Sequence, residues 1–115
     1  MMKDEEMTIK SSGGNVFLDI GFDEIEAEEL AVKTDLISIV GLAIKERKLT
    51  QRDAAKICGT HQTTLSKILS GKLDSITLDQ LAKWIVALGG SVNISISKPK
   101  PSGKAKRGSL TLQMK

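Results

Sequence analysis

Residues 50–72, TQRDAAKICGTHQTTLSKILSGK, constrain the fold more than any other stretch of the chain. Thr50 can cap a helix with its hydroxyl, and Asp53 puts a carboxylate in the first turn. Gly59 can adopt the positive φ that ends this helix, so a second helix can follow after a short turn. The apolar positions that let two crossed helices pack are Ala54, Cys58, Leu65 and Ile68. This pattern predicts a helix-turn-helix.

The second predicted helix carries an outward row of polar side chains on an apolar back. The row consists of His61, Gln62, Thr63, Thr64, Ser66 and Lys67. A solvated surface is the plain alternative, but it does not explain the glycine turn, the small Ala55 at the crossing and the apolar spacing together. Side chains of these types read base edges when a helix enters the major groove. The row therefore favours a DNA-reading helix.

Composition sets the broad class of the protein. The chain has 115 residues, 40% hydrophobic and 27% charged, which fits one globular domain. Its single cysteine, Cys58, cannot form an internal disulfide, so we expect a cytoplasmic protein. The acidic start MMKDEEM is no secretory signal, and the most apolar stretch, residues 36–44, is too short to span a bilayer.

Charge is divided unevenly along the chain. Residues 1–30 hold nine of the fourteen acidic residues and two lysines, a balance of −7, so the remainder carries +10. A basic remainder of this size predicts a polyanion partner, although a solvated charge distribution explains the same numbers.

We expect three parts in the chain. Residues 1–14 are polar and end in Ser-Ser-Gly-Gly, which predicts a flexible N-terminal arm. Residues 15–97 carry the apolar periodicity of a folded domain. Residues 98–115 hold both prolines and six basic residues without an acid, which predicts a disordered basic tail.

The folded part is predicted to be mainly α, a bundle of about five helices with one C-terminal β-strand. A short helical turn follows Asn15, a long helix begins at Asp23, and a last helix over residues 78–88 follows the motif. Residues 91–97 alternate polar and apolar, with Val92, Ile94 and Ile96 on one face, as in a half-buried strand.

The stretch LTQRDAAKICGTHQTTLSKILSGK resembles the helix-turn-helix of the Xre family of phage-repressor-like regulators. The flanking segments resemble a subgroup of short Xre-type regulators often paired with a toxin, and the likeness covers residues 9–99. Thr60 departs from the branched apolar residue usual at its position. His61 departs from the usual Ser or Thr and is a poorer helix cap.

The resemblance implies roles for particular residues, because in this family the first motif helix lies over the DNA backbone and the second enters the major groove. The implied phosphate contacts are Lys48, Gln51, Arg52 and Lys72. The implied base contacts, on helix 61–70, are His61, Gln62, Thr63 and Lys67. The function expected is a sequence-specific DNA-binding regulator, most simply a repressor.

A homodimer is expected because one helix reads only a few base pairs. Its predicted interface consists of Trp84, Val92, Ile94 and Ile96. An antitoxin, which would also bind a small toxin through the acidic segment 19–29, remains the main alternative. An adaptor with the same fold and no DNA affinity is a further alternative.

Catalysis has little support in this sequence. The chain has one histidine and one cysteine, both inside the motif, so neither a metal ligand set nor a Cys-His pair with a third residue can be assembled. We therefore expect no enzyme activity, no metal and no cofactor.

Overall fold

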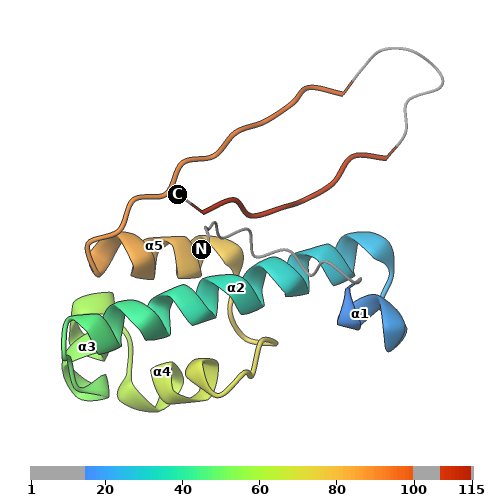
Figure 1. Cartoon of the computed structure of the whole chain (residues 1–115). Coiled ribbons are helices and arrows are strands. Elements are labelled where there is room, and N and C mark those ends of the chain that lie inside the picture. The colour runs from blue at the N-terminus through green and yellow to red at the C-terminus, as the bar shows by residue number, and fades with distance from the viewer. Residues whose placement is uncertain (1–14, 100–106, 115) are drawn as a thin grey trace, which may run out of the picture.

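The computed structural model describes residues 15–99 and 107–114, and these form a bundle of five helices with extended segments after the last one (Figure 1). The helices are α1 (Val16–Asp19), α2 (Glu24–Glu46), α3 (Gln51–Cys58), α4 (Gln62–Leu69) and α5 (Leu78–Ala87). The expected arm, residues 1–14, lies outside the described residues. Within the described part, no helix is both long enough and apolar enough to cross a membrane.

Four of the five helices begin at a side chain that caps the first turn. Asn15, Asp23 and Thr50 each accept a hydrogen bond from a backbone amide two or three residues later, at 2.8–3.0 Å. Thr77 does the same in a reciprocal capping box at the start of α5. At α4 the capping position is His61, whose side chain makes no such bond. Local polar chemistry therefore sets the starts of α1, α2, α3 and α5.

Every helix ends in one shared geometry. The residue after the last turn has a positive φ, and the next amide donates to the carbonyl five residues earlier at 2.8–3.2 Å. The positive-φ residues are Gly21, Lys48, Gly59, Gly71 and Gly89. Four are glycine, which adopts this conformation at no steric cost, and the exception is Lys48 with φ 57°. Because each helix ends at a defined residue with a positive φ, the position where the chain turns toward the next helix is also defined.

The core lies along α2, which runs through the middle of the molecule (Figure 1). Helices α1, α4 and α5 pack on α2, and α3 packs on α4 and α5. Fully buried side chains from three helices meet there: Val40 of α2, Leu65 and Ile68 of α4, and Leu81 of α5. Burial of these side chains holds α3 and α4 at one end of α2, away from α1.

The expected C-terminal β-strand is wrong. Residues 91–97 are extended, but they form no strand, and no backbone hydrogen bond joins them to another described segment. Ile94 and Ile96 are 82% and 81% exposed. Alternation of apolar residues is a local property and does predict an extended backbone, whereas a strand also needs a neighbour that completes its ladder. The sequence pattern could not supply that neighbour, so the fold is all-helical in the described residues.

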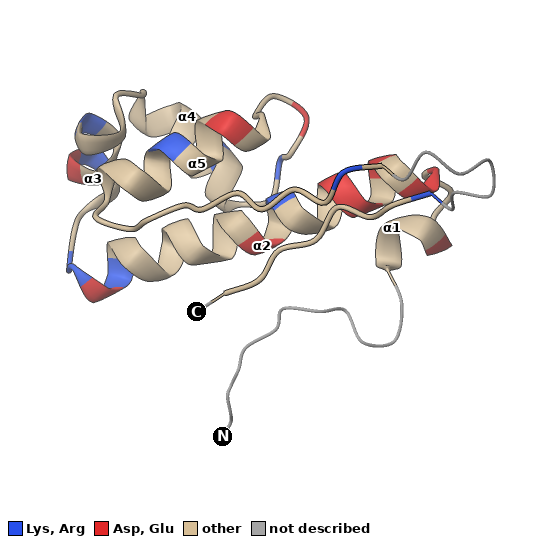
Figure 2. Ribbon diagram, turned by 90° about the horizontal axis from the view of Figure 1, so that it is seen from above, with Lys and Arg blue, Asp and Glu red and all other residues tan. Residues whose placement is uncertain are grey.

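Residues 107–114 return along α2 (Figures 1 and 2). The guanidinium of Arg107 pairs with Glu28 at 3.0 Å and with Glu24 at 3.5 Å, and the Leu110 amide donates to Glu28 at 2.8 Å. Leu112 is half-buried against the core. This C-terminal segment is part of the expected tail, whose residues 100–106 and 115 lie outside the described residues. Glu28 is thus the main polar anchor of the segment.

Glu28→Gln should loosen this anchor and lower the free energy of unfolding by about 0.5–1 kcal/mol at pH 7, the range for an exposed ion-pair network. Hydrogen bonds from Arg107 and the Leu110 amide hold the pKa of Glu28 below its ordinary value of 4.5. Because the folded-state pKa is depressed, the stabilisation is present above the unfolded pKa and is lost as pH falls through the folded pKa. Urea unfolding should therefore separate wild type and variant at neutral pH but not in strong acid.

Glu46→Gln is the matched control for this experiment. Glu46 lies at the other end of α2, is exposed and makes no ion pair among the described residues. Its replacement should leave the difference between neutral and acidic stability unchanged. An equal loss of pH dependence in both variants would contradict the anchoring role of Glu28.

Candidate nucleic-acid interface

The interface is built on the packing of α3 against α4. Ala54 and Ala55 of α3 are buried, at 0% and 2% exposure, and leave room for the second helix to approach. Gly59, with φ 72°, ends α3, and the Thr60 amide bonds to the Ala55 carbonyl at 2.9 Å. Leu65 is fully buried behind α4. The outward face of α4 is therefore fixed from behind by apolar contacts.

Four exposed polar side chains share the outer face of α4: Gln62, Thr63, Ser66 and Lys67. With about 100° between successive residues, they fall within an arc of about 140°. Gln62 and Ser66 are one turn apart, as are Thr63 and Lys67, so they form two adjacent rows. A major groove about 12 Å wide admits an α-helix, so such a face can meet base edges on the groove floor.

The start of α4 lacks the side-chain cap that the other helices have. His61 is exposed and makes no hydrogen bond to the first turn, in line with its expected weakness as a cap. Thr64, expected on the polar row, is only half exposed, because it turns toward α5 and lines a cavity there. The base-contacting set proposed from the sequence therefore remains exposed, while Thr64 does not belong to the same face.

The predicted phosphate contacts lie at the ends of the motif helices. Gln51 and Arg52 form the first turn of α3, Lys48 precedes it and Lys72 follows α4. All four are exposed. Figure 2 shows Lys and Arg together with a few acidic residues at this end of the molecule, and acidic residues gathered around α1 and the start of α2. The local field at the motif therefore favours a polyanion.

One residue has a role that the sequence did not reveal. Arg47, one of several basic residues before the motif, donates to the Leu88 carbonyl at 3.1 Å and so caps the end of α5. Ser66, expected in the outward polar row, is exposed on the outer face beside the predicted base contacts. Arg47 is thus structural, and Ser66 joins the candidate face.

The predicted dimer residues are divided between two environments. Trp84 lies in the core with 7% exposure, whereas Val92 is 39% exposed and Ile94 and Ile96 are more than 80% exposed. The three aliphatic residues are therefore accessible to a second copy, and Trp84 is largely not.

Two comparisons with known proteins bear on this arrangement. A family model described as a helix-turn-helix domain matches residues 16–97, which includes all five helices. A solved structure named "Putative XRE Family Transcriptional Regulator" aligns with a TM-score of 0.62 at 30% identity, covering 76% of this chain and 98% of the other. None of the curated proteins matches the sequence. Both matches agree with the family that residues 49–72 resemble.

Lys48→Gly should raise the free energy of unfolding by about 1 kcal/mol, because glycine adopts the positive φ of this position without the steric cost that lysine bears. Lys45→Gly, in the last helical turn, is the matched control and should lower stability by about 1 kcal/mol. Thermal or urea unfolding of both variants measures the difference. Destabilisation by both substitutions would show that the Lys48 side chain contributes packing that outweighs the backbone strain.

Proposed function

The chain belongs to the helix-turn-helix domain family and is a DNA-binding transcriptional regulator of the Xre type, and we propose that it represses promoters by reading a specific sequence as a homodimer. The observation that carries the proposal is the exposed polar face of α4, held from behind by Leu65 and Ile68. A preformed helix held from behind loses little backbone freedom on binding. Repression then needs only occupancy of the promoter.

Direct readout is assigned to the first turn of α4. The Gln62 amide offers one donor and one acceptor, which match adenine N6 and N7 in the major groove. Thr63 can touch a thymine methyl, and Lys67, one turn later, reaches a guanine or a phosphate. His61 stands at the start of the helix, where a polar contact to a base edge is feasible. An A·T pair is expected opposite Gln62 in each half-site.

Affinity is assigned to phosphate contacts on either side of this face. Gln51 and Arg52 begin α3, and Lys48 and Lys72 follow the ends of α2 and α4. All are exposed, and none forms an ion pair with another described residue, so each is open to a phosphate. Such contacts set position and salt dependence and carry no base information.

A dimer would supply two copies of α4 for two half-sites one helical turn apart. The exposed aliphatic side chains of Val92, Ile94 and Ile96 support an interface there, since their burial would remove apolar surface from water. Trp84 would contribute through the small part of its surface that remains exposed. Adaptor function without DNA affinity has no observation in its favour here.

An antitoxin role is a second candidate, favoured by the opposite end of the molecule. Helix α1 has no buried residue; Val16 and Ile20 are 60% and 66% exposed, and Ile25 of α2 is 60% exposed. These apolar side chains lie among acidic residues, far from α3 and α4 (Figures 1 and 2). A basic protein could therefore bind there while α4 is on DNA.

Co-expression with the product of an adjacent reading frame tests this second role. Ile20→Asp and Ile25→Asp should abolish co-purification of a bound partner, while DNA affinity stays at the wild-type level. Failure of any neighbouring product to co-purify with wild type would count against the antitoxin role and leave the regulator proposal untouched.

Gln62→Ala should cost about 1–3 kcal/mol per half-site and relax preference at one base pair only. Arg52→Ala should weaken binding to specific and random duplexes nearly alike, because a phosphate contact carries no sequence information. Selection of the operator from a random duplex library, followed by titration of both variants, measures the two effects. A wild-type specificity ratio in correctly folded Gln62→Ala would overturn the assigned reading face.

Wild type should sediment as a dimer at micromolar concentrations, and Ile94→Asp should shift it toward monomer by placing a charge in the interface. Leu42→Asp is the matched control, since Leu42 is also exposed, at 50%, but lies on α2. A monomeric wild type, or equal loss of dimer in both variants, would contradict the assigned interface.

A further inference from the structure

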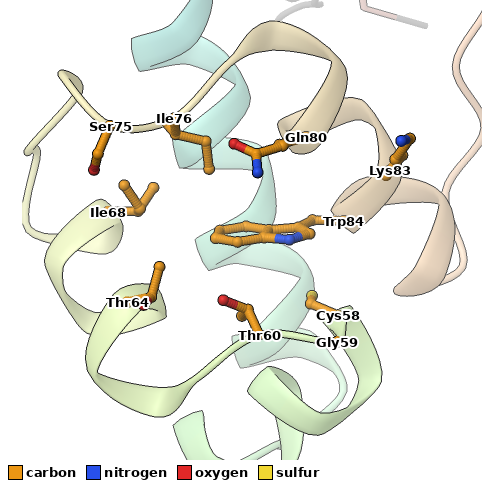
Figure 3. Close-up of a pocket in the computed structure, with 10 residues that line it drawn as sticks. All are labelled: Cys58, Gly59, Thr60, Thr64, Ile68, Ser75, Ile76, Gln80, Lys83 and Trp84. Atoms are coloured by element: carbon orange, nitrogen blue, oxygen red, sulfur yellow. The ribbon is translucent and has the colours of Figure 1, made fainter.

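A cavity of about 260 Å³ lies between the helix-turn-helix and α5 (Figure 3). Thr60 of the turn and Thr64 of α4 line one side, and Ser75, Gln80 and Lys83 line the other. The indole of Trp84 lies across the middle of the space. The cavity is not needed for DNA contacts, because the exposed face of α4 points elsewhere.

Trp84 is a largely buried residue whose indole N–H has no acceptor among the described residues. The residue is only 7% exposed, and no described residue accepts a hydrogen bond from its N–H. Tryptophan has a donor and no acceptor, and leaving a buried donor unpaired costs free energy. Since the indole borders the cavity, an acceptor placed inside it would satisfy this group.

The lining favours an anion with a flat apolar part. Lys83 supplies a positive charge, and none of the lining residues is acidic. Burial raises the pKa of the Cys58 thiol at the wall, so it stays neutral at pH 7. Asp79, one turn before Lys83, does not line the cavity, and the Thr77 hydroxyl together with the Lys83 charge holds the pKa of this carboxyl below its usual range. Ile68 and Ile76 cover the apolar side.

We propose that this cavity is a binding site for a small planar organic carboxylate. Its volume equals that of about nine water molecules in the liquid, which suits one aromatic ring with a carboxylate. The carboxylate would accept from the Trp84 N–H on the side of the cavity that Lys83 lines, and Ile68 and Ile76 line the opposite side. Because Thr60 and Thr64 belong to the motif and Gln80 to α5, the occupant would contact both parts.

Nuclear magnetic resonance tests the site directly, since the chain has one tryptophan and so one indole N–H signal. Sodium benzoate is the probe, added to the full chain without DNA. The expected result is a saturable shift of the indole N–H and of the Thr60 and Thr64 amides. Benzyl alcohol, which keeps the ring but has no charge, should bind more weakly. No DNA is present, so the result is independent of the proposed repressor function.

Lys83→Gln should weaken benzoate binding about threefold, the effect of one exposed charge. Lys45→Gln, an exposed lysine of α2 outside the cavity, is the matched control and should bind as wild type does. An indole signal that does not move with benzoate would show that water alone fills the cavity and would overturn the proposal. Equal affinity in wild type and Lys83→Gln, or equal weakening in both variants, would overturn it as well.

Discussion

Burial of Leu65 and Ile68 against the rest of the core determines what the motif presents to its surroundings. These two side chains, 0% and 1% exposed, point inward from α4 and set its rotation about its own axis. A shift by one residue would turn the helix by about 100° and move Gln62 out of the outer face. Loss of either side chain to alanine would cost about 2–5 kcal/mol, a large share of the usual 5–15 kcal/mol of a domain. Specific recognition and stability therefore depend on the same contacts.

The length of α2 separates two electrostatic environments. Its 23 residues span about 35 Å, several times the Debye length of about 8 Å at physiological salt. Acidic residues around α1 therefore repel DNA little at the motif, although the chain contains both signs in nearly equal number. Net charge alone, +3, understates how strongly the motif end favours phosphate. One helix thus allows an acidic surface and a basic surface to coexist in a small domain.

Features decided by neighbouring residues could be predicted from the sequence, and features decided by distant ones could not. Thr50 caps its helix as expected, and Asn15 and Asp23 cap the two helices that were expected to start beside them, because capping involves residues two or three positions apart. The Arg107 to Glu28 contact joins residues 79 apart, and no periodicity signals it. The strand expected over residues 91–97 failed for the same reason, since pairing is non-local. Nothing local in the sequence marked the positive φ at residue 48, because lysine rarely adopts it.

The C-terminal segment, residues 107–114, already occupies part of the acidic surface beside α1. Arg107 already pairs with Glu24 and Glu28, so a basic partner at that end would have to displace it or rely on Asp19, Asp23 and Glu26, which form no ion pair among the described residues. Exposed ion pairs contribute about 0–1 kcal/mol each, and displacing Arg107 would merely exchange one such pair for another.

At the same end, burial of apolar side chains would contribute more to binding free energy than exposed ion pairs would. Burial of a large aliphatic side chain contributes about 1.5–3 kcal/mol, and three such side chains, Val16, Ile20 and Ile25, are at least 60% exposed there. The affinity of a protein partner at this end would therefore come mainly from its fit to these side chains. The acidic residues around them would act on the rate and orientation of encounter, which is where surface charge has its largest effect.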